Sequence, residues 1–229
     1  MKLYFTQMDA PDPVISRELE NRGWHCMHMP FREVVFSAET LPDLSCYDYI
    51  VLSSKNAARL LIEQTGSQEV PPVAVVGGAT SSLLGEYPLV FQEPCVSAAE
   101  LVERLRKRLA GNEKILFLRG EKALDTIPSG LGDFSLTPLT VYKTRKIQKI
   151  HRIYTSGMVY FQAPSTVTDF SETYRNPPDF IGAIGPTTAK AIEELGWRID
   201  FQPERPEIKE LIGYLPEPGA FGQDKNSQE

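Results

Sequence analysis

The sequence predicts an α/β protein composed of two similar domains, each built on a parallel β-sheet. Three observations support this fold class. Landmark segments recur about 108 residues apart, each half of the chain alternates short apolar runs with helix signals, and the apolar runs are continuous. Continuous apolar strands that alternate with helices are typical of parallel sheets covered by helices on both faces.

The repeat rests on residues that keep nearly one offset. Pro30 and Pro138 each follow a strand-like run and lie 108 positions apart, and the turns that contain Gly77 and Gly185 keep the same spacing. Ser53 and Gln162 lie 109 positions apart. A nearly constant offset at several landmarks indicates two homologous halves in tandem, which meet near residue 111.

Helix caps and apolar runs define the elements of the first half. Asp12 is the expected N-cap of a helix that begins at Pro13, and Ser54 is the expected N-cap of another. Ser97 and Glu100 have the spacing of a capping box before an amphipathic helix. The predicted strands of this half are 3–5, 24–29, 48–52 and 72–76.

The second half follows the same order. A turn at Arg119 and Gly120 precedes a short helix up to Leu131, and a later helix begins at Thr187 and is ended by Gly196. Its predicted strands are 115–118, 159–161 and 181–184.

Three segments do not fit the strand–helix repeat. Residues 31–36 and 139–145 are extended in character and occupy the same place in their halves, so we expect them to connect the two domains. Residues 216–229 are rich in Pro, Gly and polar side chains, and this composition predicts a disordered tail.

Composition and charge exclude several classes of protein. The net charge of -6 argues against nucleic acid or an anionic membrane as partner, and no stretch approaches the ~20 apolar residues of a membrane span. The amino-terminal segment does not resemble a signal peptide. Three cysteines without a CxxC pair indicate a reduced, cytoplasmic setting, and the histidines lack the spacing of a metal site.

Four segments together resemble the uroporphyrinogen-III synthase family. Residues 49–57 resemble its strand followed by Thr/Ser-Ser-x-Asn-Ala, and residues 139–144 resemble its Val-Tyr-x-Thr segment. Residues 183–196 are similar to its most distinctive motif, and residues 116–120 match a fourth. The resemblance keeps its order from residue 1 to about residue 215, which isolated short motifs would not do.

The resemblance implies a fold and an activity. Two α/β domains, one formed by 1–33 with 148–215 and one by 36–144, would be joined by a two-stranded ladder. The implied enzyme is a lyase of tetrapyrrole, porphyrin and heme biosynthesis, which converts hydroxymethylbilane to uroporphyrinogen III with loss of water and inversion of the terminal ring. It would need no cofactor and no metal. We expect a cytoplasmic monomer that binds its small-molecule substrate, makes at most transient contact with the upstream bilane synthase, and binds neither nucleic acid nor membrane.

The resemblance places Tyr142 at the cleft, where its phenol would protonate the departing hydroxyl; a purely structural strand tyrosine is the alternative. Carboxylates of the substrate would bind hydroxyls and free backbone N–H groups at strand-to-helix turns. For these residues the alternatives are plain N-capping and solvated surface cations. The predicted substrate-binding residues are Ser53, Ser54, Lys55, Asn56, Gly77, Thr80, Arg119, Gly120, Ser165, Gly185, Thr187 and Thr188.

Two positions depart from the family pattern and keep a second hypothesis open. Gln7 stands where the bacterial family often has Arg, and Gln162 stands where it usually has Ser or Thr. The second hypothesis is a non-catalytic tetrapyrrole or anion sensor on the same scaffold. A nucleotide-binding flavodoxin-like protein is a weaker third, because no GxGxxG or Walker pattern follows any strand.

Overall fold

The chain forms two compact units in a computed structural model that describes residues 1–37, 40–66, 69–148 and 154–221. Unit 1 comprises Met1–Glu33 and Arg145–Glu229, and unit 2 comprises Val34–Thr144. Within the described ranges, no helix is both long enough and apolar enough to cross a membrane.

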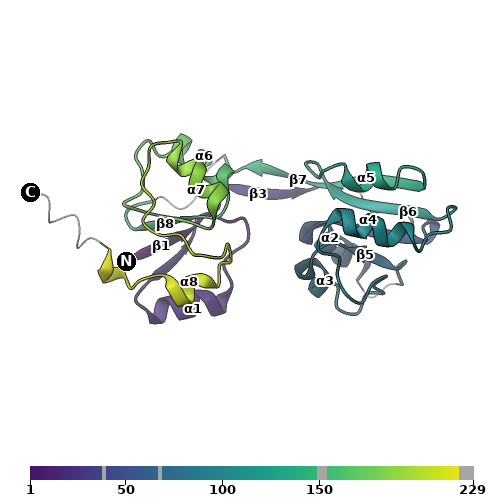
Figure 1. Cartoon of the computed structure of the whole chain (residues 1–229), viewed down its shortest axis with the longest axis horizontal. Helices are drawn as coiled ribbons and strands as arrows, with labels where there is room; N and C mark the ends of the chain where they lie inside the picture. Colours follow the sequence, from purple (N-terminus) through teal and green to yellow (C-terminus); the bar gives the residue numbers. More distant parts are fainter. Residues whose placement is uncertain (38–39, 67–68, 149–153, 222–229) are drawn as a thin grey trace, which may run out of the picture. The chain divides into compact units, whose positions relative to one another are not determined.

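Unit 1 is a parallel sheet with helices on both faces. Its strands, in spatial order, are β2 (His25–His28), β1 (Lys2–Phe5), β8 (Met158–Phe161) and β9 (Phe180–Ala183). Helices α1 (Pro13–Asn21) and α8 (Glu210–Tyr214) pack side by side on one face, and α6 (Pro164–Thr173) and α7 (Pro186–Glu193) on the other (Figure 1). The short helix η2 (Pro218–Ala220) follows α8.

Unit 2 has the same layered plan. Its strands, in spatial order, are β3 (Arg32–Phe36), β7 (Ser135–Lys146), β6 (Lys114–Gly120), β4 (Tyr49–Leu52) and β5 (Val73–Val75). The pairs from β7 to β5 are parallel. The short helix η1 (Leu44–Cys46) precedes β4. Helices α2 (Lys55–Thr65) and α3 (Gly78–Leu84) cover one face, and α4 (Ala98–Arg106) and α5 (Thr126–Gly130) cover the other.

Strands β3 and β7 carry the chain from one unit into the other. Ser37 N–H donates to the carbonyl of Val141, and Ile147 N–H donates to that of Phe31, so the paired positions rise on one strand as they fall on the other. This antiparallel pairing is the two-stranded ladder that the family resemblance implies, formed by the segments predicted to be connectors.

The repeat in the sequence reappears as a repeat in sheet topology. The order β2-β1-β8-β9 of unit 1 corresponds, strand by strand, to β7-β6-β4-β5 of unit 2. Each unit therefore combines the beginning of one half of the chain with the end of the other. Pro30 separates β2 from β3, whereas Pro138 lies inside the twelve-residue β7, which fuses the equivalents of both strands.

Most predicted caps are confirmed. The side chain of Asp12 accepts a hydrogen bond from Val14 N–H at 2.8 Å, with Pro13 at the first position of α1. Ser54 Oγ accepts from Ala57 N–H at 3.2 Å at the start of α2. Two expectations need correction.

The first correction concerns the predicted turn at Arg119 and Gly120, because β6 continues through Gly120 and keeps its pairing with β7. The second concerns the predicted disordered tail. Trp24 Nε1–H donates to the carbonyl of Pro216 at 3.1 Å, and the ring of Phe221 packs edge-on against Trp24. Aromatic burial thus outweighs the polar composition up to residue 221. Residues 222–229 lie outside the described residues.

A buried carboxylate in unit 1 holds the ends of both connecting strands. Asp169 on α6 accepts from Arg32 Nε at 2.6 Å and Nη2 at 3.3 Å, and Lys146 Nζ lies 3.8 Å from it. Arg32 belongs to β3 and Lys146 to β7. The side chain of Asp169 is only 4% exposed, so these ion pairs are largely shielded from solvent on the carboxylate side.

Replacement of Asp169 by Asn is expected to lower the free energy of unfolding by about 2 kcal/mol, because Arg32 loses its ionised partner in a largely buried site. Urea denaturation measures this change. The matched control is Asp133→Asn, whose partner Arg106 is 46% exposed, so little change is expected there. Equal losses in the two variants would contradict a specific role for Asp169.

Candidate functional site

A pocket of about 370 Å³ lies in unit 2, at the carboxyl ends of its parallel strands. This edge is where open parallel sheets bind ligands, because the strand-to-helix turns converge there. The lining residues follow β4 and β5, end or follow β6, lie in the first turns of α4 and α5, or lie on β7. They are Ser53, Ser54, Val76, Ala98, Gly120, Glu121, Lys122, Ala123, Leu124, Ile127, Tyr142 and Thr144.

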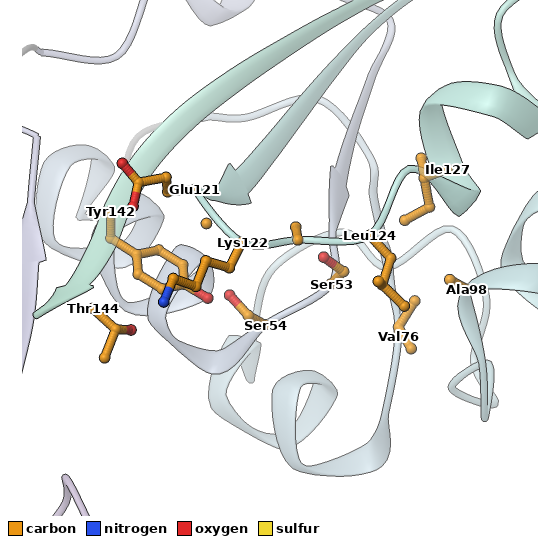
Figure 2. Close-up of a pocket in the computed structure, with 12 residues that line it drawn as sticks. Ser53, Ser54, Val76, Ala98, Glu121, Lys122, Leu124, Ile127, Tyr142 and Thr144 are labelled. Atoms are coloured by element: carbon orange, nitrogen blue, oxygen red, sulfur yellow. The ribbon is translucent and has the colours of Figure 1, made fainter. Parts of the chain in front are cut away.

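The pocket has an apolar end and a polar end. Figure 2 shows Val76, Ala98, Leu124 and Ile127 gathered at one end. The opposite end carries the side chains of Glu121, Lys122, Tyr142 and Thr144, with Ser53 and Ser54 between the two ends (Figure 2). An apolar lining with a few polar groups at one end is typical of a small-molecule site.

Tyr142 is the predicted catalytic residue, and its side chain lies in this pocket. Its ring points toward Ser54 and Lys122 (Figure 2). The ring also packs edge-on against Phe36, with centroids 6.4 Å apart. Tyr142 therefore has the packing expected of a structural strand tyrosine and also faces a cavity.

Ser53, Ser54 and Gly120 are the predicted binding residues that line the same pocket. Ser54 Oγ already caps α2, whereas Ser53 is half-buried beside it at the end of β4. Lys55 and Asn56 continue into α2 and do not line the pocket. Asn56 Oδ1 accepts a hydrogen bond from Arg59 at 3.2 Å.

Arg119 does not reach into the pocket; it supports the loop that lines it. Its guanidinium donates to Asp125 Oδ1 at 3.1 Å and to the carbonyl of Ala123, and it lies over the ring of Phe117. Its side chain is 14% exposed. Residues 121–124 of this loop line the pocket, so Arg119 affects the site by holding the loop in place and not by contacting a ligand.

The other predicted residues lie elsewhere. Gly77 has a φ of 85° and precedes α3, in which Thr80 is buried. In unit 1, Ser165 is half-buried in the first turn of α6, and Gly185 precedes α7, where Thr187 is exposed. Thr188, only 1% exposed, is part of the packed interior of unit 1.

The two departures from the family pattern bind each other. Gln162 Nε2 donates to Gln7 Oε1 at 2.7 Å, and Gln7 N–H donates to Gln162 Oε1 at 2.9 Å. They follow β8 and β1, which are neighbouring strands. The two residues therefore form one reciprocal pair of neutral amides, in which each side chain is a partner of the other residue.

Sequence reasoning missed the loop after β6. Glu121, Lys122 and Leu124 line the pocket, and Thr144 does so from β7. For the three loop residues the available signal was their position beyond the carboxyl end of the predicted strand 115–118. For Thr144 it was its place in the segment 139–144. In the part of the chain that the structure describes, no group of three or more His, Cys, Asp or Glu residues is arranged to hold a metal ion.

Comparisons with known proteins agree with one another. Residues 13–213 match the family model described as Uroporphyrinogen-III synthase HemD. The uroporphyrinogen-III synthase of Chlorobaculum parvum is 27% identical over 213 residues, which cover 82% of this chain and 87% of that protein. The putative uroporphyrinogen-III synthase of Methanocaldococcus jannaschii is 24% identical, over 94% of this chain and 96% of that protein.

A solved structure shares the fold. The crystal structure of uroporphyrinogen-III synthetase from Helicobacter pylori is similar with a TM-score of 0.66 and 15% identity. The alignment covers 93% of this chain and 96% of that one. At this identity the likeness supports the fold alone.

Proposed function

The chain belongs to the uroporphyrinogen-III synthase family, and from this premise we propose that the pocket of unit 2 binds the reacting end of hydroxymethylbilane, with Tyr142 as proton donor. The protein is a lyase that cyclises hydroxymethylbilane to uroporphyrinogen III in heme biosynthesis. The non-catalytic sensor is not favoured by this family membership. We further propose that it acts as a cytoplasmic monomer, in transient contact at most with the upstream bilane synthase.

The chemistry needs a proton where the terminal hydroxyl leaves. The Tyr142 phenol donates its proton to that hydroxyl. The carbon–oxygen bond then breaks, water leaves, and the terminal pyrrole becomes an azafulvene cation. The substituted carbon of the last ring then attacks this cation and forms a spiro intermediate. The old bond from that carbon to the preceding bridge carbon breaks, and the bridge carbon bonds to the free carbon of the last ring, which inverts the ring and releases the proton of that carbon. The proton released on closure returns to the phenolate, so that the net change is the loss of one water.

The enzyme must also favour one closure over another, because the free bilane closes to the unrotated isomer I. A 100-fold preference corresponds to about 2.7 kcal/mol of difference between the two barriers, which positioning of the ring can supply. The apolar end of the pocket, which includes Leu124 and Ile127, offers a surface for the face of a pyrrole ring. The presence of Tyr142 in a pocket with such a lining is the observation that carries the assignment.

Lys122 supplies the positive charge among the lining residues and is proposed to bind a substrate carboxylate. Its side chain extends toward Tyr142 (Figure 2). The negative charge of neighbouring Glu121 cancels the positive charge of Lys122 at larger distances. Lys122 is therefore proposed to act through a direct hydrogen-bonded ion pair with the carboxylate. The hydroxyl of Thr144 is a further donor at the same end, and that of Ser53 is one between the two ends.

The activity is tested with freshly prepared hydroxymethylbilane, followed by oxidation of the products and chromatographic separation of isomers I and III. Dominant isomer III is expected from the wild-type protein. Tyr142→Phe is expected to lower kcat about 100-fold. Tyr47→Phe, which removes a phenol outside the pocket in the same unit, should leave kcat unchanged. Isomer I alone, at the rate without protein, would favour the sensor.

The carboxylate contact is tested by Lys122→Gln, which is expected to raise KM about threefold at low salt with little change in kcat, because it removes one exposed ion pair. The increase should shrink as ionic strength rises. Lys143→Gln removes the same charge from an exposed position on β7 outside the pocket. If both substitutions raised KM equally, the effect would come from the overall charge of the protein and not from a contact between Lys122 and the substrate.

A further inference from the structure

The pairing of β6 with β7 contains one irregularity, and it lies at Tyr142. Partners run regularly from Lys114 with Ser135 to Arg119 with Thr140, but Gly120 then pairs with Tyr142 and skips Val141. Val141 and Tyr142 are consecutive, yet both contact the core beneath α2 and α3. In a regular strand consecutive side chains point to opposite faces, so the irregularity places Tyr142 on the face of Val141.

Gly120 provides the space that the ring then occupies. A Cβ atom on Gly120 would lie 2.5 Å from Tyr142 Cζ, 2.7 Å from its Oη and 2.9 Å from its Cε2. Gly120 is not among the glycines with positive φ, so its backbone conformation is open to any residue. The requirement for glycine at this position is therefore one of space and not of backbone conformation.

One backbone hydrogen bond and one ring contact hold Tyr142 in this place. Glu121 N–H donates to the carbonyl of Tyr142 at 2.9 Å, which ties the residue after Gly120 to the backbone of Tyr142. Phe36 packs edge-on against the ring, with an angle of 66° between the ring planes. The ring thus has contacts on β6 and β3, and its hydroxyl is left at the pocket.

We propose that Gly120 is a positioning residue for the reaction: because it has no side chain, the Tyr142 ring lies against β6 and presents its hydroxyl to the pocket. This inference rests on the proposed role of Tyr142 as proton donor. It assigns to Gly120 a function through Tyr142 instead of the direct substrate contact predicted from the sequence.

Gly120→Ala displaces the ring and is expected to lower kcat about tenfold or more, with KM within about threefold of wild type, and to raise the fraction of isomer I. The matched control is Gly130→Ala in the same unit, where a Cβ would lie 2.5 Å from Val102 Cγ1 and away from the pocket. Both variants should lower Tm. Only Gly120→Ala should lower kcat per folded molecule, and an equal kcat loss in both would overturn the proposal.

A double-mutant cycle separates positioning from general damage. In the Tyr142→Phe background no hydroxyl remains to be placed, so Gly120→Ala should lower kcat no further. Multiplicative losses would overturn the proposal. Wild-type kcat in Tyr142→Phe would overturn the proposed proton donor itself, whereas a loss in Tyr142→Phe with none in Gly120→Ala would overturn this inference alone.

If Gly120→Ala does not fold, Phe36→Leu provides a second test. It adds no atom between β6 and β7, and it removes the aromatic contact on the other side of the Tyr142 ring. Its expected effect is a smaller fall in kcat, absent in the Tyr142→Phe background. Unchanged kcat in Phe36→Leu, or a fall that persists without the phenol, would contradict the positioning of Tyr142 by its neighbours.

Discussion

The parallel pairing of β6 with β7 is the interaction on which the rest of the structure depends. It extends the sheet of unit 2 as far as β7, and β7 in turn pairs with β3 to carry the chain into unit 1. A slip of one residue in this register would send every side chain of β7 to the opposite face. The one irregularity, at Gly120, brings Tyr142 onto the same face as Val141 without disturbing the regular pairs before it.

The proposed reaction depends more on how this scaffold positions the substrate than on strongly reactive side chains. Its lining combines one phenol, one ammonium, one carboxylate, several hydroxyls and an apolar wall. The reaction asks chiefly for a choice between two ring closures, and a few kcal/mol of positioning suffices for that choice. Residues that hold others in place, such as Arg119 behind the loop and Gly120 beneath the ring, are therefore as important as those that touch the substrate.

Local signals in the sequence predict the strands, the helix caps and the repeat, because each depends on neighbouring residues. The exchange of half-segments between units leaves the offset unchanged, so only the family resemblance indicates it. The mutual pairing of Gln7 with Gln162 joins residues 155 positions apart, so no local pattern predicts it. The hydrogen bond from Arg119 to the carbonyl of Ala123 is local, but it depends on the path of the loop after β6, which the sequence does not specify. No residue type in the sequence predicts the bulge at Val141. Gly120 explains the bulge only when the structure shows that Tyr142 lies opposite it.

The most direct test of the central claim is a crystal structure of the protein with uroporphyrinogen III bound under anaerobic conditions. We predict that one pyrrole ring of the product lies in the pocket of unit 2 against Tyr142, with a carboxylate at Lys122. Product bound on unit 1 alone, with Tyr142 free of any contact to it, would contradict the account.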